Sequence, residues 1–177
     1  MRRLGRELGV EAMSLYGYVD NKQDLLEGVL ARVYAEMPTD AVGPWTTRLR
    51  TIAGRFRSVL LRHPNLVGLV AARPVTCQAG VQMVESTLAA LRDAGLDLVQ
   101  ANQALNVVVG FTVGHVTDQV GDGTLVRTGE VVDGLDRERF PNVTERAALD
   151  ADHDAEFEVG LDVIVAGISR LADPMPV

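Results

Sequence analysis

The chain has 177 residues, of which 47% are hydrophobic and 23% charged, and this balance excludes an intrinsically disordered protein. No apolar run approaches the roughly 20 residues that span a bilayer, and no secretory leader is recognisable, so we expect a soluble cytoplasmic protein with no membrane partner. The single cysteine, Cys77, excludes an internal disulfide and fits a reducing compartment.

The net charge of −7 argues mildly against a general nucleic-acid binder. Residues 1–37 carry five basic and six acidic side chains, a balance of −1, whereas residues 38–177 carry 12 and 18, a balance of −6. A nearly neutral N-terminal part can bind DNA when its few cations face the phosphates. The charge pattern therefore permits DNA binding without predicting it.

The run LGVEAMSLYGYVDNKQDLL, which begins at Leu8, has the layout of a helix-turn-helix. Gly9 ends a first short helix, the chain turns, and a second short helix starts near Ala12. Leu15 and Val19 lie four apart on one helical face, as core residues of a small helical domain do. The second helix of a helix-turn-helix enters the DNA major groove, although many helical hairpins share this pattern.

Charged and capping residues flank this run. Arg2 and Arg3 belong either to a solvated helix end or to a phosphate-contacting surface, and the neighbouring run favours phosphate contact. Asn21 is expected to cap a long helix, with Asp24 completing an imperfect capping box. Lys22 then falls in the first turn, where the helix N-terminus favours a phosphate.

Helical periodicity predicts the remaining elements. We expect helices over 21–37, 45–63, 66–72, 76–93, 98–120, 143–149 and 155–171, with a loop over 121–139. The stretch PTDAVGP, from Pro38, places a domain boundary after residue 37. No strand-length alternating run occurs, so the predicted fold class is all-α, with a head at 1–37 and a C-terminal body at 38–177.

Glycines recur inside two of these helices. Gly110 and Gly114 lie four apart, and Gly160 and Gly167 lie seven apart, so each pair shares a helical face. Because glycine in a helix interior costs about 1 kcal/mol relative to alanine, a packing reason is expected. The close approach could come from the same subunit or from a second copy of the chain.

The run from Leu8 also resembles, almost letter for letter, the recognition region of the tetracycline-repressor (TetR) family of transcriptional regulators. The resemblance continues through the blocks PWTTRLRTIAGRFRSVLLRHP, ARP, LAALRDAGL, ALNVVVGFTVGH and EFEVGLDVIVAGISRL. It covers nearly the whole chain except the loop. The family places one more helix ahead of Met1, so we expect the first DNA-binding helix to be missing from the head.

The resemblance implies a homodimeric, ligand-responsive repressor whose partners are double-stranded operator DNA and a small-molecule effector. The implied DNA-binding residues, which contact phosphates or base edges, are Arg2, Arg3, Ala12, Met13, Ser14, Tyr16, Tyr18 and Lys22. The implied dimer interface lies on the 98–120 and 155–171 helices, with Gly110, Gly114, Leu161, Ile164 and Ile168 as its candidates.

The resemblance also implies an effector pocket between the 45–63, 76–93 and 98–120 helices. Its candidate residues are Phe56, Arg73, Thr87, Leu105 and Asp118, of which Phe56 and Leu105 fit plain core positions equally well. This chain has Leu69 where the founding repressor has a metal-binding histidine, and Ile52 where it has a ligand-contacting asparagine. Leucine cannot coordinate Mg²⁺, so we expect an apolar effector and neither a metal nor a cofactor.

Two other classes remain open. The missing first helix leaves room for a dimeric small-molecule-binding protein that has lost DNA binding. A soluble enzyme has less support, because the sequence contains no phosphate-binding glycine loop and no nucleophile elbow. The histidines His63, His115 and His153 also lie in different predicted elements. We therefore expect no enzyme.

Overall fold

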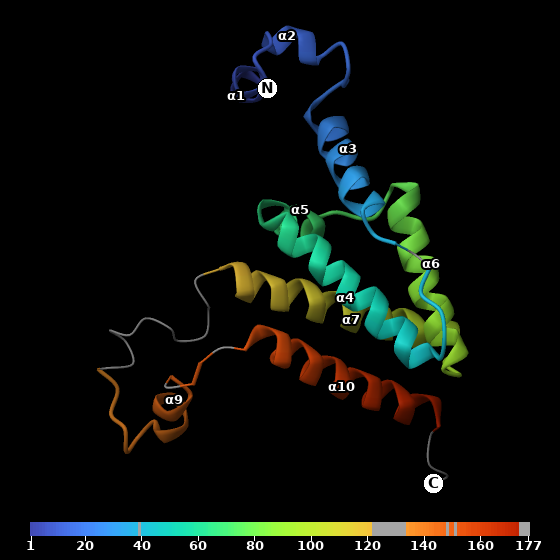
Figure 1. Ribbon diagram of the computed structural model, residues 1–177, viewed down its shortest axis with the longest axis vertical. Coiled ribbons are helices and arrows are strands. Elements are labelled where there is room, and N and C mark those ends of the chain that lie inside the picture. Colours follow the sequence, from blue (N-terminus) through green and yellow to red (C-terminus); the bar gives the residue numbers. More distant parts are fainter. Residues whose placement is uncertain (39, 122–133, 148, 151, 174–177) are drawn as a thin grey trace.

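The computed structural model describes residues 1–38, 40–121, 134–147, 149–150 and 152–173, except the side chain of Ala12. Every regular element in these ranges is helical, which confirms the predicted all-α class. The elements are α1 (Arg2–Leu8), α2 (Ala12–Leu15), α3 (Lys22–Ala35), α4 (Trp45–Arg62), the 3₁₀ turn η1 (Pro64–Leu66), α5 (Val67–Ala72), α6 (Gln78–Asp93), α7 (Leu98–Val120), α9 (Pro141–Arg146) and α10 (His153–Ala172) (Figure 1). None of these helices combines the length and apolar character of a membrane span.

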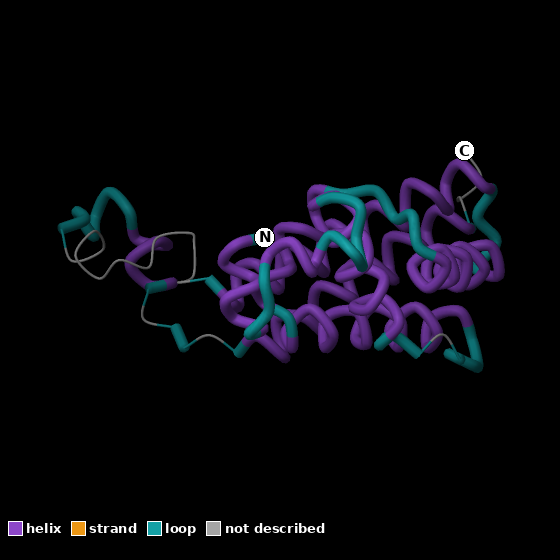
Figure 2. The backbone as a smooth tube through the Cα atoms, turned by 90° about the horizontal axis from the view of Figure 1, so that it is seen from above, coloured by secondary structure: helices purple, strands orange, loops and turns teal. Residues whose placement is uncertain are grey.

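The body is built around α7, which packs against α4, α6 and α10 (Figure 1). Helix α3 leads from α1 and α2 to this body, where its C-terminal half packs against α6. Helix α9 lies apart from the body in both views (Figures 1 and 2). Most of the predicted 121–139 loop lies outside the described residues.

Helix boundaries follow local capping chemistry. Helix α7 has the predicted bounds because Asp97 and Gln100 form a capping box, with the Asp97 carboxylate accepting from the Gln100 N–H at 2.8 Å. Helix α9 begins earlier than predicted because Pro141, with its fixed φ, fits the first helical turn. Helix α10 begins at His153, since the Asp152 carboxylate accepts the Ala155 N–H at 3.0 Å.

Two apolar clusters hold the body together. The first joins α3, α4, α5, α6 and α7, and its buried members include Val33, Tyr34, Phe56, Leu60, Val70, Met83 and Val116. The second joins α4, α6, α7 and α10, and its buried members include Leu49, Leu91, Leu105, Phe157, Leu161 and Ile168. Burying each large apolar side chain stabilises the fold by roughly 1.5–3 kcal/mol. The first cluster also anchors α3, and hence the head, on the body.

An aromatic cluster fixes the start of α10. The rings of Phe111 and Phe157 stack with centroids 5.3 Å apart, and the ring of His115 lies 5.3 Å from that of Phe157. The His115 Nε2 lies 2.9 Å from the carbonyl oxygen of His153 and must donate to it, because a carbonyl only accepts. Burial lowers the pKa of His115, against the opposing effect of this hydrogen bond, so a neutral imidazole ties α7 to α10.

Candidate functional site

The turn between α1 and α2 is a Schellman motif made by Gly9. Gly9 has a left-handed φ of 68°, and its N–H donates to the carbonyl of Arg6. The N–H of Val10 donates to the carbonyl of Gly5 at 2.9 Å, which completes the motif. Helices α1 and α2 contact each other and lie at the end of α3 that is remote from the body (Figure 1).

The second short helix and its exit expose large side chains. Met13 is 75% exposed and Tyr18 88% exposed, and Tyr16 is also exposed. Leu15 and Val19 are half-buried, in keeping with their predicted role as core residues of the head. Leu15 of α2 therefore faces the interior of the head, whereas Met13 of α2 and the two tyrosines that follow the helix face outward.

The remaining DNA-binding candidates are also at the surface. Arg2 and Arg3 on α1, Ser14 on α2 and Lys22 at the first position of α3 are exposed, whereas the Ala12 side chain lies outside the description. Asn21 caps α3 as predicted, since its side chain accepts the N–H of Asp24 at 3.0 Å. The Asp24 carboxylate reaches back to the Asp20 N–H at 3.0 Å, one residue before the cap, which is why the capping box is imperfect.

The predicted effector residues lie in different elements of the body. Phe56 is buried in the first apolar cluster and Leu105 in the second. Thr87 is buried on α6, and its hydroxyl donates to the carbonyl of Met83 at 2.8 Å. Arg73, at the end of α5, and Asp118, near the end of α7, are half-buried. Their role in effector binding stays a prediction.

A second buried hydroxyl was not predicted. Thr112 on α7 is fully buried, and its hydroxyl donates to the carbonyl of Val108 at 2.8 Å. Its signal in the sequence was a polar residue inside an apolar helix. Ile52 is buried and Leu69 packs against the first cluster, so both positions that distinguish this chain from the founding repressor lie in apolar surroundings. Within the described ranges no group of three or more His, Cys, Asp and Glu could hold a metal ion.

The predicted dimer residues divide into two sets. Gly110 and Gly114 are exposed, and a β-carbon at either position would meet nothing within 4 Å. Leu161 and Ile168 are instead buried inside the protomer, and Ile164 packs against the same cluster, so these three side chains serve the chain's own core. The exposed apolar residues of α10 include Val159 and Val163. The α10 part of the prediction therefore needs correction, because the predicted stripe faces inward and a different apolar stripe faces outward.

The two glycines of α10 also differ in their surroundings. A β-carbon at Gly160 would clash with Cζ and Cε2 of Phe111, so the close approach there is made within the protomer. A β-carbon at Gly167 would meet nothing within 4 Å. The two glycines share a spacing but not a packing role.

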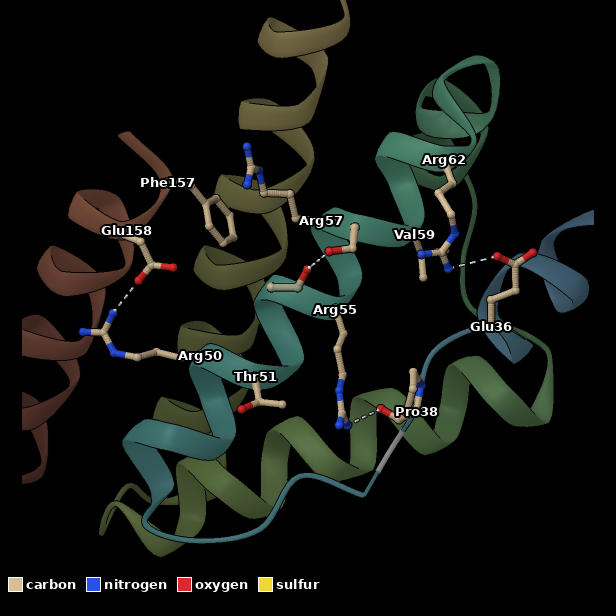
Figure 3. Close-up of a pocket in the computed structure, with 12 residues that line it drawn as sticks. Glu36, Pro38, Arg50, Thr51, Arg55, Arg57, Val59, Arg62, Phe157 and Glu158 are labelled. Carbon is tan, nitrogen blue, oxygen red and sulfur yellow. Dashed lines mark hydrogen bonds and ion pairs between the residues drawn. The ribbon is translucent and has the colours of Figure 1, made fainter. Parts of the chain in front are cut away.

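The described residues also outline a groove of about 450 Å³ on the outer side of α4, facing α10 (Figure 3). Phe56, Arg73, Thr87, Leu105 and Asp118 do not line it. Four arginines of α4 do, namely Arg50, Arg55, Arg57 and Arg62. Sequence reasoning missed this groove, because its other wall comes from residues about 100 positions further along the chain.

A short helix pair that is followed by exposed tyrosines and joined by a long helix to an all-helical body is typical of the helix-turn-helix class of DNA-binding regulators. Residues 37–172 match the family described as tetracyclin repressor-like, C-terminal domain. The chain therefore belongs to the TetR family of transcriptional regulators.

Relatives with known names agree with this placement. The chain is 33% identical over 123 residues to the HTH-type transcriptional repressor DrrR1 of Streptomyces coeruleorubidus, a match that covers 68% of this chain but only 46% of DrrR1. It is 31% identical over 175 residues to the class A tetracycline repressor protein from transposon 1721 of Escherichia coli, covering 96% and 80% of the two chains. The crystal structure of the TetR family protein ActR from Streptomyces coelicolor, in complex with actinorhodin, superposes with a TM-score of 0.78 at 27% identity, covering 98% of this chain and 88% of ActR.

Proposed function

We propose that this chain is a homodimeric repressor that binds double-stranded operator DNA in the cytoplasm and releases it when a largely apolar small molecule binds the body. It is a regulator rather than an enzyme. Residues 1–37 form the DNA-binding head and residues 38–177 the effector-binding and dimerisation body. The observation that carries this proposal is the exposure of Met13, Tyr16 and Tyr18 on and beside a short helix whose opposite face is turned inward.

Each exposed group of the head has a distinct use on DNA. Met13 offers only apolar contact, for instance to a thymine methyl, whereas the Tyr16 and Ser14 hydroxyls can hydrogen-bond base edges. Arg2, Tyr18 and Lys22 provide phosphate contacts that set the register. Lys22 adds its charge to the positive end of the α3 dipole. Sequence readout by α2 therefore depends on few hydrogen bonds.

Substitutions at Lys22 and at Tyr16 are expected to change operator binding in different ways. Lys22→Ala should weaken binding to all double-stranded sequences about equally and lower the salt dependence by roughly one phosphate contact. Tyr16→Ala should also change which palindrome is preferred, because it removes a base-reading group. Both effects can be measured by first selecting palindromes from a random pool. Fluorescence anisotropy at several salt concentrations then gives the affinity of each variant for the selected sites.

Tyr18→Ala is the matched control, since it removes a neighbouring exposed tyrosine assigned to phosphate. It should reduce affinity for specific and random DNA by the same factor. If Tyr16→Ala also reduced affinity for specific and random DNA by the same factor, Tyr16 would not read bases. Failure of the unaltered chain to bind any selected palindrome would contradict the proposal itself.

The effector site is proposed to lie between α4, α6 and α7. These helices enclose an apolar interior that includes Phe56, Met83 and Leu105, with Thr87 and Thr112 as the buried polar side chains of the described body. Each of those hydroxyls donates to its own helix, so it can offer a ligand only its acceptor lone pairs. ActR, a relative of the same family, is known in complex with actinorhodin, which supports a small-molecule effector here.

A thermal-shift screen tests the chemistry of this effector. Apolar or aromatic compounds that bind the folded protein should raise its melting temperature by mass action, whereas tetracycline with Mg²⁺ should not. The stabilisation should shrink in Phe56→Ala and Leu105→Ala. Stabilisation by tetracycline that requires Mg²⁺ would contradict the interpretation of Leu69, and an apolar ligand unaffected by both variants would place the pocket elsewhere.

The dimer is proposed to form through the outward stripes of α7 and α10. On α7 the stripe contains Val99 and Val107, both more than half exposed, followed by Gly110 and Gly114. On α10 it contains Val159, Val163, Ala166 and Gly167, all exposed. Because α7 packs beside α10, we infer that the two stripes join into one surface of apolar and small residues. Such a surface, doubled by two-fold symmetry, makes a four-helix bundle.

A further inference from the structure

Three helices meet at the first residue of α10. The carbonyl oxygen of His153 lies 2.9 Å from Nε2 of His115 on α7, and Nη2 of Arg57 on α4 donates to the same oxygen at 3.4 Å. The rings of His115 and His153 also meet edge to face, with centroids 6.0 Å apart. One carbonyl therefore joins the start of α10 to both α7 and α4.

The groups that make this junction are largely withdrawn from water. The side chain of Arg57 is 12% exposed and that of His153 is 21% exposed. His115 is half-buried, and its ring packs against the rings of Phe111 and Phe157, with centroids 5.8 Å and 5.3 Å away. Charges in such a place are screened by solvent less than charges on the open surface.

The charged neighbours of His115 come from α4 and α10. From α4, Arg57 contributes a permanent positive charge, and its partner Asp154, at 2.7 Å, is 86% exposed. From α10, the ring of His153 can carry a second positive charge, and its Nδ1 lies 3.2 Å from the carboxylate of Glu156, which is 55% exposed. The cationic groups are therefore the buried members of the junction, and the carboxylates are its exposed members.

Burial is the main reason why His115 is neutral at this junction. Burial lowers the pKa of the ring, and the nearby Arg57 and His153 lower it further. The hydrogen bond to the His153 carbonyl and the charge of Glu156 raise the pKa, without cancelling these effects. Because the pKa is lower in the packed chain than in an exposed segment, the stabilising effect of the neutral ring is complete above the ordinary histidine pKa of about 6.5. It is lost as the pH falls through the lowered value.

We propose that His115, Arg57 and the His153 carbonyl form an acid-sensitive latch, which holds the first turn of α10 against α7 and α4 at neutral pH and releases it in acid. When His115 takes up a proton, its Nε2 can still donate to the carbonyl, but the new charge lies beside the guanidinium of Arg57 and the ring of His153. Repulsion between these cations adds to the cost of burying the new charge. Both effects favour a conformation in which the first turn of α10 has moved toward water.

Release of this turn has a consequence for association of two copies of the chain. The outward stripe of α10, which includes Val159 and Val163, follows the first turn. Loosening the start of α10 should therefore weaken the proposed dimer in acid. This consequence rests on the proposed function, whereas the latch itself belongs to a single protomer.

Hydrogen exchange of the first turn of α10 measures the release. Between about pH 7.5 and about pH 6, protection factors of peptides that cover residues 153–160 should fall about three- to tenfold in the unaltered chain. His115→Gln is the decisive variant, because the glutamine amide can still donate to the carbonyl but cannot take up a proton. Its protection factors should change by less than about twofold over the same range. Equal falls in the two proteins would overturn the proposal.

Two further variants test which charges matter. His63→Gln is the matched control, since Nε2 of His63 lies 2.9 Å from the Glu36 carboxylate, where a proton strengthens a contact instead of weakening one. This variant should keep the full acid response of α10. Arg57→Gln keeps the sensing ring but removes the fixed charge, so its acid response should be smaller. A response that disappears in His63→Gln, or persists in full in Arg57→Gln, would contradict the latch.

NMR of the imidazole C–H groups follows the proton on His115 directly. The chain has three histidines, and His63→Gln and His153→Gln identify two of their signals, which assigns the third to His115 even if His115→Gln does not fold. This signal should titrate at a lower pH than histidine in the urea-unfolded chain, and at a higher pH in Arg57→Gln. A midpoint at or above the unfolded value would overturn the proposal. None of these measurements involves DNA, so failure here leaves the repressor proposal to its own test.

Discussion

The double substitution Gly110→Leu and Gly114→Leu is expected to convert the dimer into a monomer and to reduce operator affinity by about 10²- to 10⁴-fold. Both glycines are exposed on the outward stripe of α7, where two leucine side chains would separate closely approaching backbones. A β-carbon at either position meets no atom of its own protomer within 4 Å. The fold of the protomer should therefore remain intact. Loss of the dimer uncouples the two heads, and each half-site is then bound separately. Sedimentation at low protein concentration and anisotropy on a palindromic site measure the two effects.

Gly68→Leu provides the matched control for this experiment. Gly68 is an exposed helical glycine of α5 with open space around its β-carbon, and it lies outside the stripe. The control should stay dimeric with unchanged operator affinity. A double variant that sediments as the unaltered dimer would show that the stripe is not the interface.

Much of the fold could be predicted because each helix carries its own start and stop signals. Asp97 and the glycine at residue 121 delimit α7 at the predicted positions, and Asn21 caps α3. The inward face of α4 follows from its spacing, since Phe56 falls at a buried position, whereas Thr87 on α6 was singled out only by the family resemblance. These features depend only on residues close together in the sequence, so capping and periodicity rules are enough to predict them.

The faces of α10 could not be assigned in this way. Leu161 and Ile168 form a clear apolar stripe, yet Val159 and Val163 form a second one, and periodicity does not say which stripe meets α7. The arginine groove was missed for a related reason. Arg50 pairs with Glu158, 108 residues along the chain, and no spacing rule connects two residues brought together only by tertiary packing.

Gly160→Ala is expected to destabilise the protein by about 1–3 kcal/mol, although alanine in a helix interior ordinarily stabilises by about 1 kcal/mol relative to glycine. The added methyl group would overlap the Phe111 ring, which cannot retreat freely because it stacks between Phe157, at 5.3 Å, and His115, at 5.8 Å. Relief of the overlap therefore requires α10 to shift away from α7. Urea denaturation at a fixed protein concentration measures the change in the free energy of unfolding.

Two further variants distinguish overpacking at Gly160 from a general effect of replacing glycine by alanine in a helix. Gly54→Ala makes the same change in the interior of α4, where a β-carbon meets nothing within 4 Å, and it should stabilise the protein by roughly 0.5–1 kcal/mol. In a Phe111→Leu background the ring that the added methyl group would strike is gone, so adding Gly160→Ala there should cost almost nothing. The two substitutions are then strongly non-additive, as expected for residues in direct contact. Additive losses in the double variant would mean that the penalty at Gly160 arises from something other than the close approach of α10 to Phe111.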